Sequence, residues 1–261
     1  MIKDYFKPSS LEEALDYKKK NPGAFYLGGG TKLNKTGEDF YAESYISLEN
    51  LDLDGISLEG GVLKIGSMVT LQKLMDSEDV PLFLKESAAG ESNRNIRNAS
   101  TVGGEIAYCH SSSTVVTGLL ALEAEVETAE GATKTLEQYI SGKREELIKG
   151  IVLPSSKAVL VQRDKRVTSN CRPELSVAVS ILKDKEKVQK AVLVMGGIGE
   201  IPVRLKNVEK RLIDGSLASA DSVQDAVQDE LVPFTEKHER GTYLNYIGGV
   251  LAADTVGRAM R

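Results

Sequence analysis

Two glycine-rich stretches of this chain combine bare backbone with a threonine hydroxyl. The first, Gly28-Gly29-Gly30-Thr31, follows the apolar run AFYL, and the second, Thr101-Val102-Gly103-Gly104, lies much later in the chain. Glycine lacks a Cβ atom, so another group can approach its backbone closely. Successive backbone N–H groups and a hydroxyl are suitable donors for phosphate oxygens. Two such turns facing each other could hold the diphosphate of a dinucleotide, and a flexible turn is the alternative for each stretch taken alone.

The common phosphate-binding motifs do not account for these stretches. A Walker A loop needs G-x-x-x-x-G-K-[ST], whereas here Thr31 precedes Lys32 and the glycines are adjacent. A dinucleotide fingerprint needs G-x-G-x-x-G; Gly28 and Gly30 fit it, but Leu33 occupies the place of the third glycine. The sequence therefore supports neither an ordinary ATPase nor an ordinary nicotinamide-binding domain. Backbone amides would do most of the neutralising of a diphosphate, since the basic residues nearby are few.

Metal chemistry is not expected from this chain alone. Its two cysteines, Cys109 and Cys171, fit no metal-ligand spacing and cannot form a four-cysteine iron–sulfur cluster. The two histidines, His110 and His238, make a histidine-based zinc site improbable. We expect Cys109 to be a small buried residue, with a redox role as the minor alternative.

Composition narrows the class of protein further. The 261 residues carry a formal net charge of −5, so the chain has no global basic field suited to nucleic acid. Tryptophan is absent, which disfavours base-stacking platforms. The N-terminal sequence MIKDYFKPSS has no apolar signal region, and no apolar run approaches the roughly 20 residues of a membrane span. We expect a cytoplasmic protein that binds neither nucleic acid nor membrane.

The hydrophobic pattern predicts mixed helices and strands before Pro154. A helix over 11–20 is capped by Ser9 or Ser10, a second begins after Thr70, and residues 113–122 form a mostly apolar core helix. The expected strands cover 24–27, 44–48, 62–65 and 124–128, with another after the turn at Glu130-Gly131.

A different pattern follows Pro154. Three strands are expected in KAVLVQRDKRV, LSVAVSIL and KAVLVMGG, with KDKEK as the hairpin turn between the last two. Helices are expected over about 216–231 and 240–259. Strands followed by helices indicate a separate α+β unit. We place the boundary near Ser155-Ser156, which gives domains 1–156 and 157–261.

These motifs together resemble a known family. The chain is similar to the FAD-binding subunits of molybdenum hydroxylases, the group that includes xanthine dehydrogenase and carbon monoxide dehydrogenase. LGGGTKL resembles that family's first diphosphate loop, L-A-G-G-T-D-L, and IRNASTVGGEIA resembles its second, I-R-N-x-A-T-I-G-G-N-I. LLALEAEVE, GGIGEIPVRLKNVE and YLNYIGGVLA continue the similarity in the right order.

The resemblance implies a fold and a role. Residues 1–156 would be a two-lobed α+β FAD-binding domain of the vanillyl-alcohol-oxidase-like (PCMH) type. Residues 157–261 would be a small α+β domain, like the C-terminal domain of the carbon monoxide dehydrogenase flavoprotein, with a three-stranded antiparallel sheet and helices. Such a subunit takes electrons from an iron–sulfur partner into FAD and passes them to NAD(P) or another acceptor, in a complex whose molybdenum cofactor lies in a further subunit. No side chain of this chain need act as a catalytic acid, base or nucleophile.

The resemblance also implies which residues contact FAD. The first loop would supply Phe25, Tyr26, Leu27, Gly28, Gly29, Gly30, Thr31, Lys32, Leu33 and Asn34, with Gly29, Gly30 and Thr31 closest to the diphosphate. The second would supply Thr101, Gly103, Gly104 and Glu105. The set is completed by Ile96 near a ring of the cofactor, Leu147 against the flavin, and Arg163 or Lys165 near the isoalloxazine. A purely structural role is the alternative for each of these.

The chain departs from the family pattern at several of these positions. Lys32 and Thr114 stand where the family usually has Asp, Glu105 stands where it has Asn, and His110-Ser111-Ser112 replaces an S-P-x segment. These changes imply an altered flavin potential or nucleotide preference, and resemble flavin subunits of proposed selenium-dependent hydroxylases or selenate reductases. Two alternatives stay open: a scaffold subunit that has lost FAD, and a free-standing flavoenzyme of the same fold.

Overall fold

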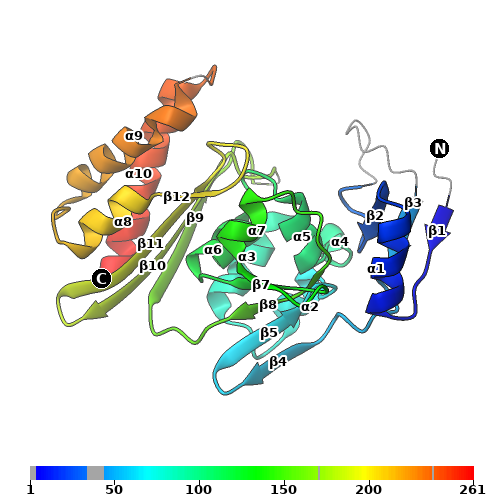
Figure 1. Ribbon diagram of the computed structural model, residues 1–261. Helices are drawn as coiled ribbons and strands as arrows, with labels where there is room; N and C mark the ends of the chain where they lie inside the picture. The colour runs from blue at the N-terminus through cyan, green and yellow to red at the C-terminus, as the bar shows by residue number, and fades with distance from the viewer. Residues whose placement is uncertain (1–3, 34–43, 170, 237) are drawn as a thin grey trace. The chain divides into compact units, whose positions relative to one another are not determined.

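The computed structural model of the protein describes residues 4–33, 44–169, 171–236 and 238–261. They form two compact units, whose elements are labelled in Figure 1. Unit 1 comprises Met1–Val80, Ser92–Tyr108 and Ala124–Pro154, and unit 2 comprises Pro81–Glu91, Cys109–Glu123 and Ser155–Arg261. Each unit is built from three separate stretches of chain, so the units do not coincide with the domains 1–156 and 157–261 expected from the sequence. That domain division remains a prediction.

A small parallel sheet in unit 1 carries the first glycine stretch. Its strands are β1 (Asp4–Phe6), β3 (Ser44–Ser47) and β2 (Ala24–Leu27), in the order β1-β3-β2. Helix α1 (Leu11–Lys20) packs against β3 and buries Ala14 beside Ile46. The helix begins where the Ser10 hydroxyl accepts a hydrogen bond from the Glu13 N–H at 3.2 Å, as the sequence predicts. The glycine stretch starts directly after β2.

The second sheet of unit 1 is antiparallel. Its order is β4-β5-β8-β6-β7, formed by β4 (Ile56–Glu59), β5 (Val62–Gly66), β8 (Ile148–Leu153), β6 (Glu125–Thr128) and β7 (Thr133–Thr135). Gly60 and Gly61 both have positive φ, 59° and 83°, which suits the two-residue turn between β4 and β5. The accompanying helices are α2 (Leu71–Asp76), α4 (Arg94–Arg97), α5 (Val102–Tyr108) and α7 (Leu136–Ser141).

Unit 2 is built around a twisted antiparallel sheet in the order β12-β11-β10-β9. The three long strands predicted from the sequence are β9 (Val159–Lys165), β10 (Leu175–Asp184) and β11 (Lys187–Gly196), and the two-residue strand β12 (Val203–Arg204) extends them. Helices α8 (Lys206–Ile213) and α10 (Gly241–Met260) pack on the sheet, and α9 (Ala220–Thr235) packs on α10. Two earlier helices, α3 (Leu82–Glu91) and α6 (Thr114–Ala121), also belong to this unit.

Strand β10 is buried on both faces. Leu175, Val177, Val179 and Ile181 join a core cluster with residues of α8, α9 and α10. The alternate residues include Ser176, whose hydroxyl lies 2.9 Å from the Thr117 hydroxyl of α6. Since side chains alternate across a strand, α6 covers the face opposite to α10. The expected apolar core helix is confirmed, because every residue of α6 is buried.

One predicted turn is a helix. The sequence predicts a glycine turn at residues 101–104, whereas Val102–Tyr108 form α5 and carry both glycines in its first turn. The Thr101 hydroxyl accepts a hydrogen bond from the Gly104 N–H at 3.1 Å, which stabilises the start of the helix. The low helix propensity of glycine is outweighed by packing, because a Cβ atom at Gly103 would lie 2.6 Å from the Cβ atom of Ser67.

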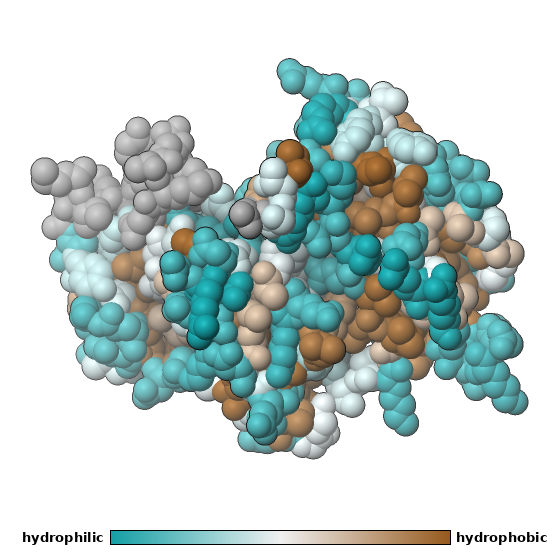
Figure 2. All heavy atoms as spheres, turned by 180° about the vertical axis from the view of Figure 1, so that it is seen from behind, coloured by the Kyte–Doolittle hydropathy of each residue, from teal (hydrophilic) through white to brown (hydrophobic). Residues whose placement is uncertain are grey.

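On the face shown in Figure 2, hydrophobic residues form patches between hydrophilic ones. The large apolar side chains that are exposed include Leu82 and Val167. Within the described part of the chain, the helices are too short or too polar for a membrane crossing.

Candidate functional site

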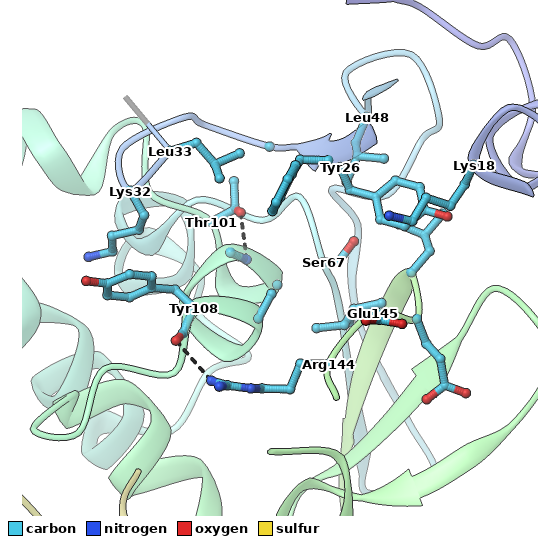
Figure 3. Close-up of a pocket in the computed structure, with 18 of the residues that line it drawn as sticks. Lys18, Tyr26, Lys32, Leu33, Leu48, Ser67, Thr101, Tyr108, Arg144 and Glu145 are labelled. Atoms are coloured by element: carbon cyan, nitrogen blue, oxygen red, sulfur yellow. Dashed lines mark hydrogen bonds between the residues drawn. The ribbon is translucent and has the colours of Figure 1, made fainter. Parts of the chain in front are cut away.

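Unit 1 contains a cavity of about 820 Å³ beside the first glycine stretch. This volume lies in the range of about 300–1,000 Å³ that is typical of small-molecule and cofactor sites. Its walls come from the end of β2 with the following loop, from α5, and from the segment that leads into β8; Figure 3 shows these walls. The predicted site residues that line it are Phe25, Tyr26, Gly28, Gly29, Gly30, Thr31, Lys32, Leu33, Thr101, Gly103, Gly104 and Leu147.

The two glycine stretches touch each other directly. A Cβ atom at Gly29 would lie only 1.6 Å from the carbonyl oxygen of Ala99, so glycine is needed for this approach. Two positions later, the hydroxyls of Thr31 and Ser100 lie 2.9 Å apart. The stretches thus form one continuous wall of the cavity, and bare backbone at Gly29 serves the contact between them.

A buried hydroxyl belongs to this wall. Ser67 follows β5, is 3% exposed, and its Oγ atom has no hydrogen-bond partner among the described residues. Ser67 lines the cavity and lies below Thr101 in Figure 3. A buried polar group without a partner costs free energy, and such groups in proteins are commonly satisfied by water or a ligand. The Ser67 hydroxyl is therefore a donor that a ligand of the cavity could satisfy if the side chain turns toward it.

Two of the departures from the family pattern form an ion pair. Lys32 Nζ lies 3.1 Å from Glu105 Oε1, and the two side chains are only 13% and 1% exposed. Lys32 lines the cavity, whereas Glu105 lies outside its lining. The ammonium also lies 5.4 Å from the ring centroid of Tyr108, which lines the same side. Lys32 and Glu105 are separate changes in the sequence, and the structure joins them.

The far end of the cavity is aromatic and basic. Lys18 lies over the ring of Tyr26 at 5.8 Å and donates hydrogen bonds to the carbonyl oxygens of Pro22 and Ala24. Burial lowers the pKa of Lys18 and raises the pKa of the Tyr26 phenol to about 12. Tyr26 and Lys18 lie side by side in Figure 3, in a cation–π contact.

Arg144 closes another side of the cavity. Its backbone has a positive φ of 56°, which is uncommon for a residue other than glycine. Its Nη1 atom donates a hydrogen bond to the carbonyl oxygen of Tyr108 at 3.1 Å. This bond ties the segment before β8 to the end of α5.

The lining carries an excess of basic side chains. The charged residues that line it are Lys18, Lys19, Lys32, Lys143, Arg144, Glu145 and Glu146. Together with the buried hydroxyl and the bare backbone, this composition favours an elongated anionic ligand that also has apolar rings. A dinucleotide such as FAD fits these features. Among the described residues, no cluster of three or more His, Cys, Asp or Glu side chains could hold a metal ion.

Several predicted residues lie away from the cavity lining. Leu27, Ile96 and Glu105 belong to unit 1 without lining the cavity, and Ile96 is 39% exposed. Arg163 and Lys165 lie on β9 in unit 2, where Arg163 Nε is 3.6 Å from Asp254 Oδ2 and Lys165 donates to the Arg166 carbonyl. Asn34 lies outside the described residues. The proposed roles of these six residues in FAD binding remain predictions.

Thr114, the third departure from the family pattern, caps a buried network in unit 2. Its N–H donates to Glu91 Oε2 at 2.9 Å, and its hydroxyl donates to the Ser87 carbonyl at 2.7 Å. The Glu91 side chain is 1% exposed and pairs with Arg172 Nη2 at 3.0 Å. Thr114 thus holds a buried carboxylate at the start of α6.

Part of the cavity wall was not predicted from the sequence. Ser67, Tyr108 and Arg144 were not identified because each lies in a segment that carries no phosphate motif. The run GKREE before Leu147 was the available signal, since it places charges of both signs directly before a strand. Only the tertiary fold brings this run to the glycine loops.

Comparison with known proteins agrees with the cavity. Residues 1–156 match the family described as "FAD binding domain in molybdopterin dehydrogenase", and residues 173–243 match "CO dehydrogenase flavoprotein C-terminal domain". The uncharacterised protein YgfM of Escherichia coli strain K12 is 31% identical over 97% of this chain and 95% of its own length. The xanthine dehydrogenase FAD-binding subunit of Escherichia coli O157:H7 is 30% identical over 47% of this chain and 44% of its own.

A solved structure shares the fold. Carbon monoxide dehydrogenase from Hydrogenophaga pseudoflava contains a chain that superposes with a TM-score of 0.88 at 22% identity, covering 99% of this chain and 97% of that one. The expected α+β fold, with an FAD-binding domain and a C-terminal domain, is confirmed.

Proposed function

This chain belongs to the family of FAD-binding domains of molybdopterin dehydrogenases, and we propose that it is the electron-transfer subunit of a multi-subunit molybdenum hydroxylase. In this role it receives electrons from an iron–sulfur subunit and passes them to NAD(P) or another acceptor. The molybdenum cofactor lies in a third subunit, and the complex is cytoplasmic. The observation that carries the proposal is the cavity of unit 1, whose walls are the two glycine stretches.

The proposed binding mode follows from the donors in the cavity. The diphosphate lies along the wall made by Gly29–Thr31 and Thr101–Gly104, where the first stretch supplies backbone N–H groups and Thr101 supplies a hydroxyl. The N–H groups of Gly103 and Gly104 already donate to the Ser67 carbonyl and the Thr101 hydroxyl. The Ser67 hydroxyl, beside Gly103 in the same wall, supplies a further donor. Tyr26 and Leu147 supply flat or apolar surface for a ring.

The chain's residues bind and orient the cofactor, and the cofactor supplies the redox chemistry. FAD accepts and donates electrons singly or in pairs, which suits a relay between one-electron iron–sulfur centres and a two-electron acceptor. Residues of this chain hold its diphosphate, exclude water from the lined cavity and set the charge around it. A catalytic acid or base is not required for that task.

Titration of the purified chain with FAD tests binding. We expect one flavin per chain, displacement by ADP, and weak competition by riboflavin, because the donors of the cavity face the diphosphate half. Visible absorption and flavin fluorescence report the binding. A chain that stays colourless and takes up no FAD would contradict the proposal and favour a scaffold subunit.

Reduction by the partner tests the relay. The chain is expressed together with the iron–sulfur subunit of its complex, the clusters are reduced without oxygen, and flavin bleaching is followed in time. We expect bleaching in the complex and recovery of the flavin spectrum on addition of NAD+ or NADP+, or of an artificial acceptor if neither serves. Turnover of a small substrate by the isolated chain would favour the free-standing flavoenzyme instead.

A further inference from the structure

The ion pair of Lys32 and Glu105 stands at the wall where the diphosphate is proposed to lie. Lys32 follows the first glycine stretch directly, and Glu105 follows the second. The 3.1 Å pair therefore bridges the two stretches at the point where they meet. Figure 3 shows Lys32 at the edge of the cavity beside Tyr108.

The two partners face the cavity differently. Lys32 lines it, so its ammonium is within reach of a ligand there. Glu105 is buried behind the lining and cannot reach the ligand itself. Its negative charge acts on the cavity through Lys32, because two opposite charges at this distance and in a buried setting strongly offset each other.

We propose that Glu105 is a positioning residue that sets the affinity of the site by holding the Lys32 ammonium and offsetting its charge toward the diphosphate. This inference rests on the proposed function, since it concerns FAD in the same cavity. With the pair intact, Lys32 adds little to the attraction that the other basic side chains, the hydroxyls and the first glycine stretch exert on the diphosphate. The salt dependence of FAD affinity then comes from those other basic side chains and not from Lys32.

Removing the Glu105 charge releases the ammonium to the ligand. In Glu105→Gln the shape of the side chain is kept, and Lys32 becomes an uncompensated cation on the cavity wall. We expect FAD to bind roughly tenfold more tightly, with a steeper loss of affinity as salt is raised, because a charge-assisted contact replaces a neutral one. Glu105→Asn removes the same charge and serves as the second variant if the first folds poorly.

The double variant Lys32→Gln/Glu105→Gln removes both charges. It should bind FAD within about threefold of the unchanged chain and with the same salt dependence, because the summed charge of these two positions is again zero. Glu59→Gln is the matched control for charge alone, since Glu59 is an exposed residue of β4 that does not line the cavity. It should leave both quantities unchanged.

The experiment is a set of FAD titrations at low and high salt, with thermal unfolding of each FAD-free variant recorded beside it. Tighter and more salt-dependent binding in the Glu105 variants, reversed in the double variant, is the expected result. Equal or weaker binding in folded Glu105 variants would overturn the inference and make the pair a purely structural brace. If neither the unchanged chain nor any variant binds FAD, the proposed function itself fails. That outcome is distinct from failure of the inference about Glu105.

Discussion

Gly29 lies so close to Ala99 that a Cβ atom at Gly29 would be 1.6 Å from the Ala99 carbonyl oxygen. This contact joins two segments that are far apart in sequence and fixes the wall of the cavity. Thr31 and Ser100 repeat the connection through their hydroxyls. The glycine is thus required by the fold of the apo chain, before any ligand is considered.

Gly29→Ala should destabilise the FAD-free protein. The added methyl group forces the two segments apart, and such overpacking costs about 1–3 kcal/mol or more. Chemical unfolding followed by circular dichroism measures the change. Gly55→Ala is the control, because nothing lies within 4 Å of a Cβ atom there, and it should stay within about 0.5 kcal/mol of the unchanged chain. Equal stability of the two variants would contradict the contact.

Ser67→Ala should change stability and affinity in opposite directions. Removing a buried hydroxyl that has no partner among the described residues should leave FAD-free stability equal or slightly higher. FAD affinity should fall about tenfold or more, since a hydrogen bond to a charged group contributes roughly 1.5–3 kcal/mol. Ser92→Ala is the matched control: its Oγ atom is also buried without a partner, but Ser92 does not line the cavity. Unchanged FAD affinity in Ser67→Ala would show that this hydroxyl does not contact the ligand.

Stability should fall as the pH rises from about 10 to about 12. The unfolded chain releases the tyrosine proton near pH 10, whereas burial holds the pKa of Tyr26 in the folded chain at about 12. The unfolded state therefore binds fewer protons in this window, and the free energy of unfolding decreases. In Tyr26→Phe the decrease should be smaller, although not absent, because burial also raises the pKa of Tyr139.

Urea midpoints at pH 9 and at the alkaline end of this window measure the effect. Tyr246→Phe, which removes an exposed phenol, is the control and should retain the full loss. An identical loss in Tyr26→Phe and in Tyr246→Phe would mean that Tyr26 ionises as a solvated tyrosine does.

Arg172→Met should strongly destabilise unit 2. It leaves the buried Glu91 carboxylate without its ion-pair partner at 3.0 Å, and breaking such a pair typically costs about 3–5 kcal/mol. The hydrogen bonds from Ser113 Oγ and Thr114 N–H remain and should keep the loss near the lower limit. Adding Glu91→Gln should restore part of the stability.

The control for this buried ion pair is the exposed pair of Arg258 and Asp254. Arg258→Met removes a partner of Asp254 at the surface, where both side chains are almost half exposed, so the loss should stay below about 1 kcal/mol. Thermal unfolding compares the variants. A loss in Arg172→Met as small as that in Arg258→Met would show that Glu91 is solvated.

Local patterns predicted the elements whose signals are contained in a few residues. The Ser10 cap with the acidic first turn and basic last turn predicts α1, and the apolar stretch 113–122 predicts the buried helix α6. The short strands β1 and β12 were missed because three and two residues carry no periodicity. Their pairing depends on strands that are distant in sequence.

The part of the candidate site that is formed by glycine backbone could be predicted from the sequence. Glycine and threonine motifs indicated the wall, and the cavity lies beside them. The ion pair between Lys32 and Glu105 and the orientation of Ser67 could not be inferred, because they depend on how separate segments meet. The turn expected at Gly103-Gly104 was wrong for the same reason, since contact with Ser67 decides the local conformation.

The interleaved course of the chain has a consequence for its biosynthesis. Helices α3 and α6 belong to unit 2, yet they leave the ribosome before β9, β10 and β11, the strands against which α6 is buried. Until those strands are made, the apolar residues of α6 have no sheet to cover them. The nascent chain should then depend on chaperones that shield hydrophobic segments, and a stalled or prematurely ended translation product should be a target for proteolysis.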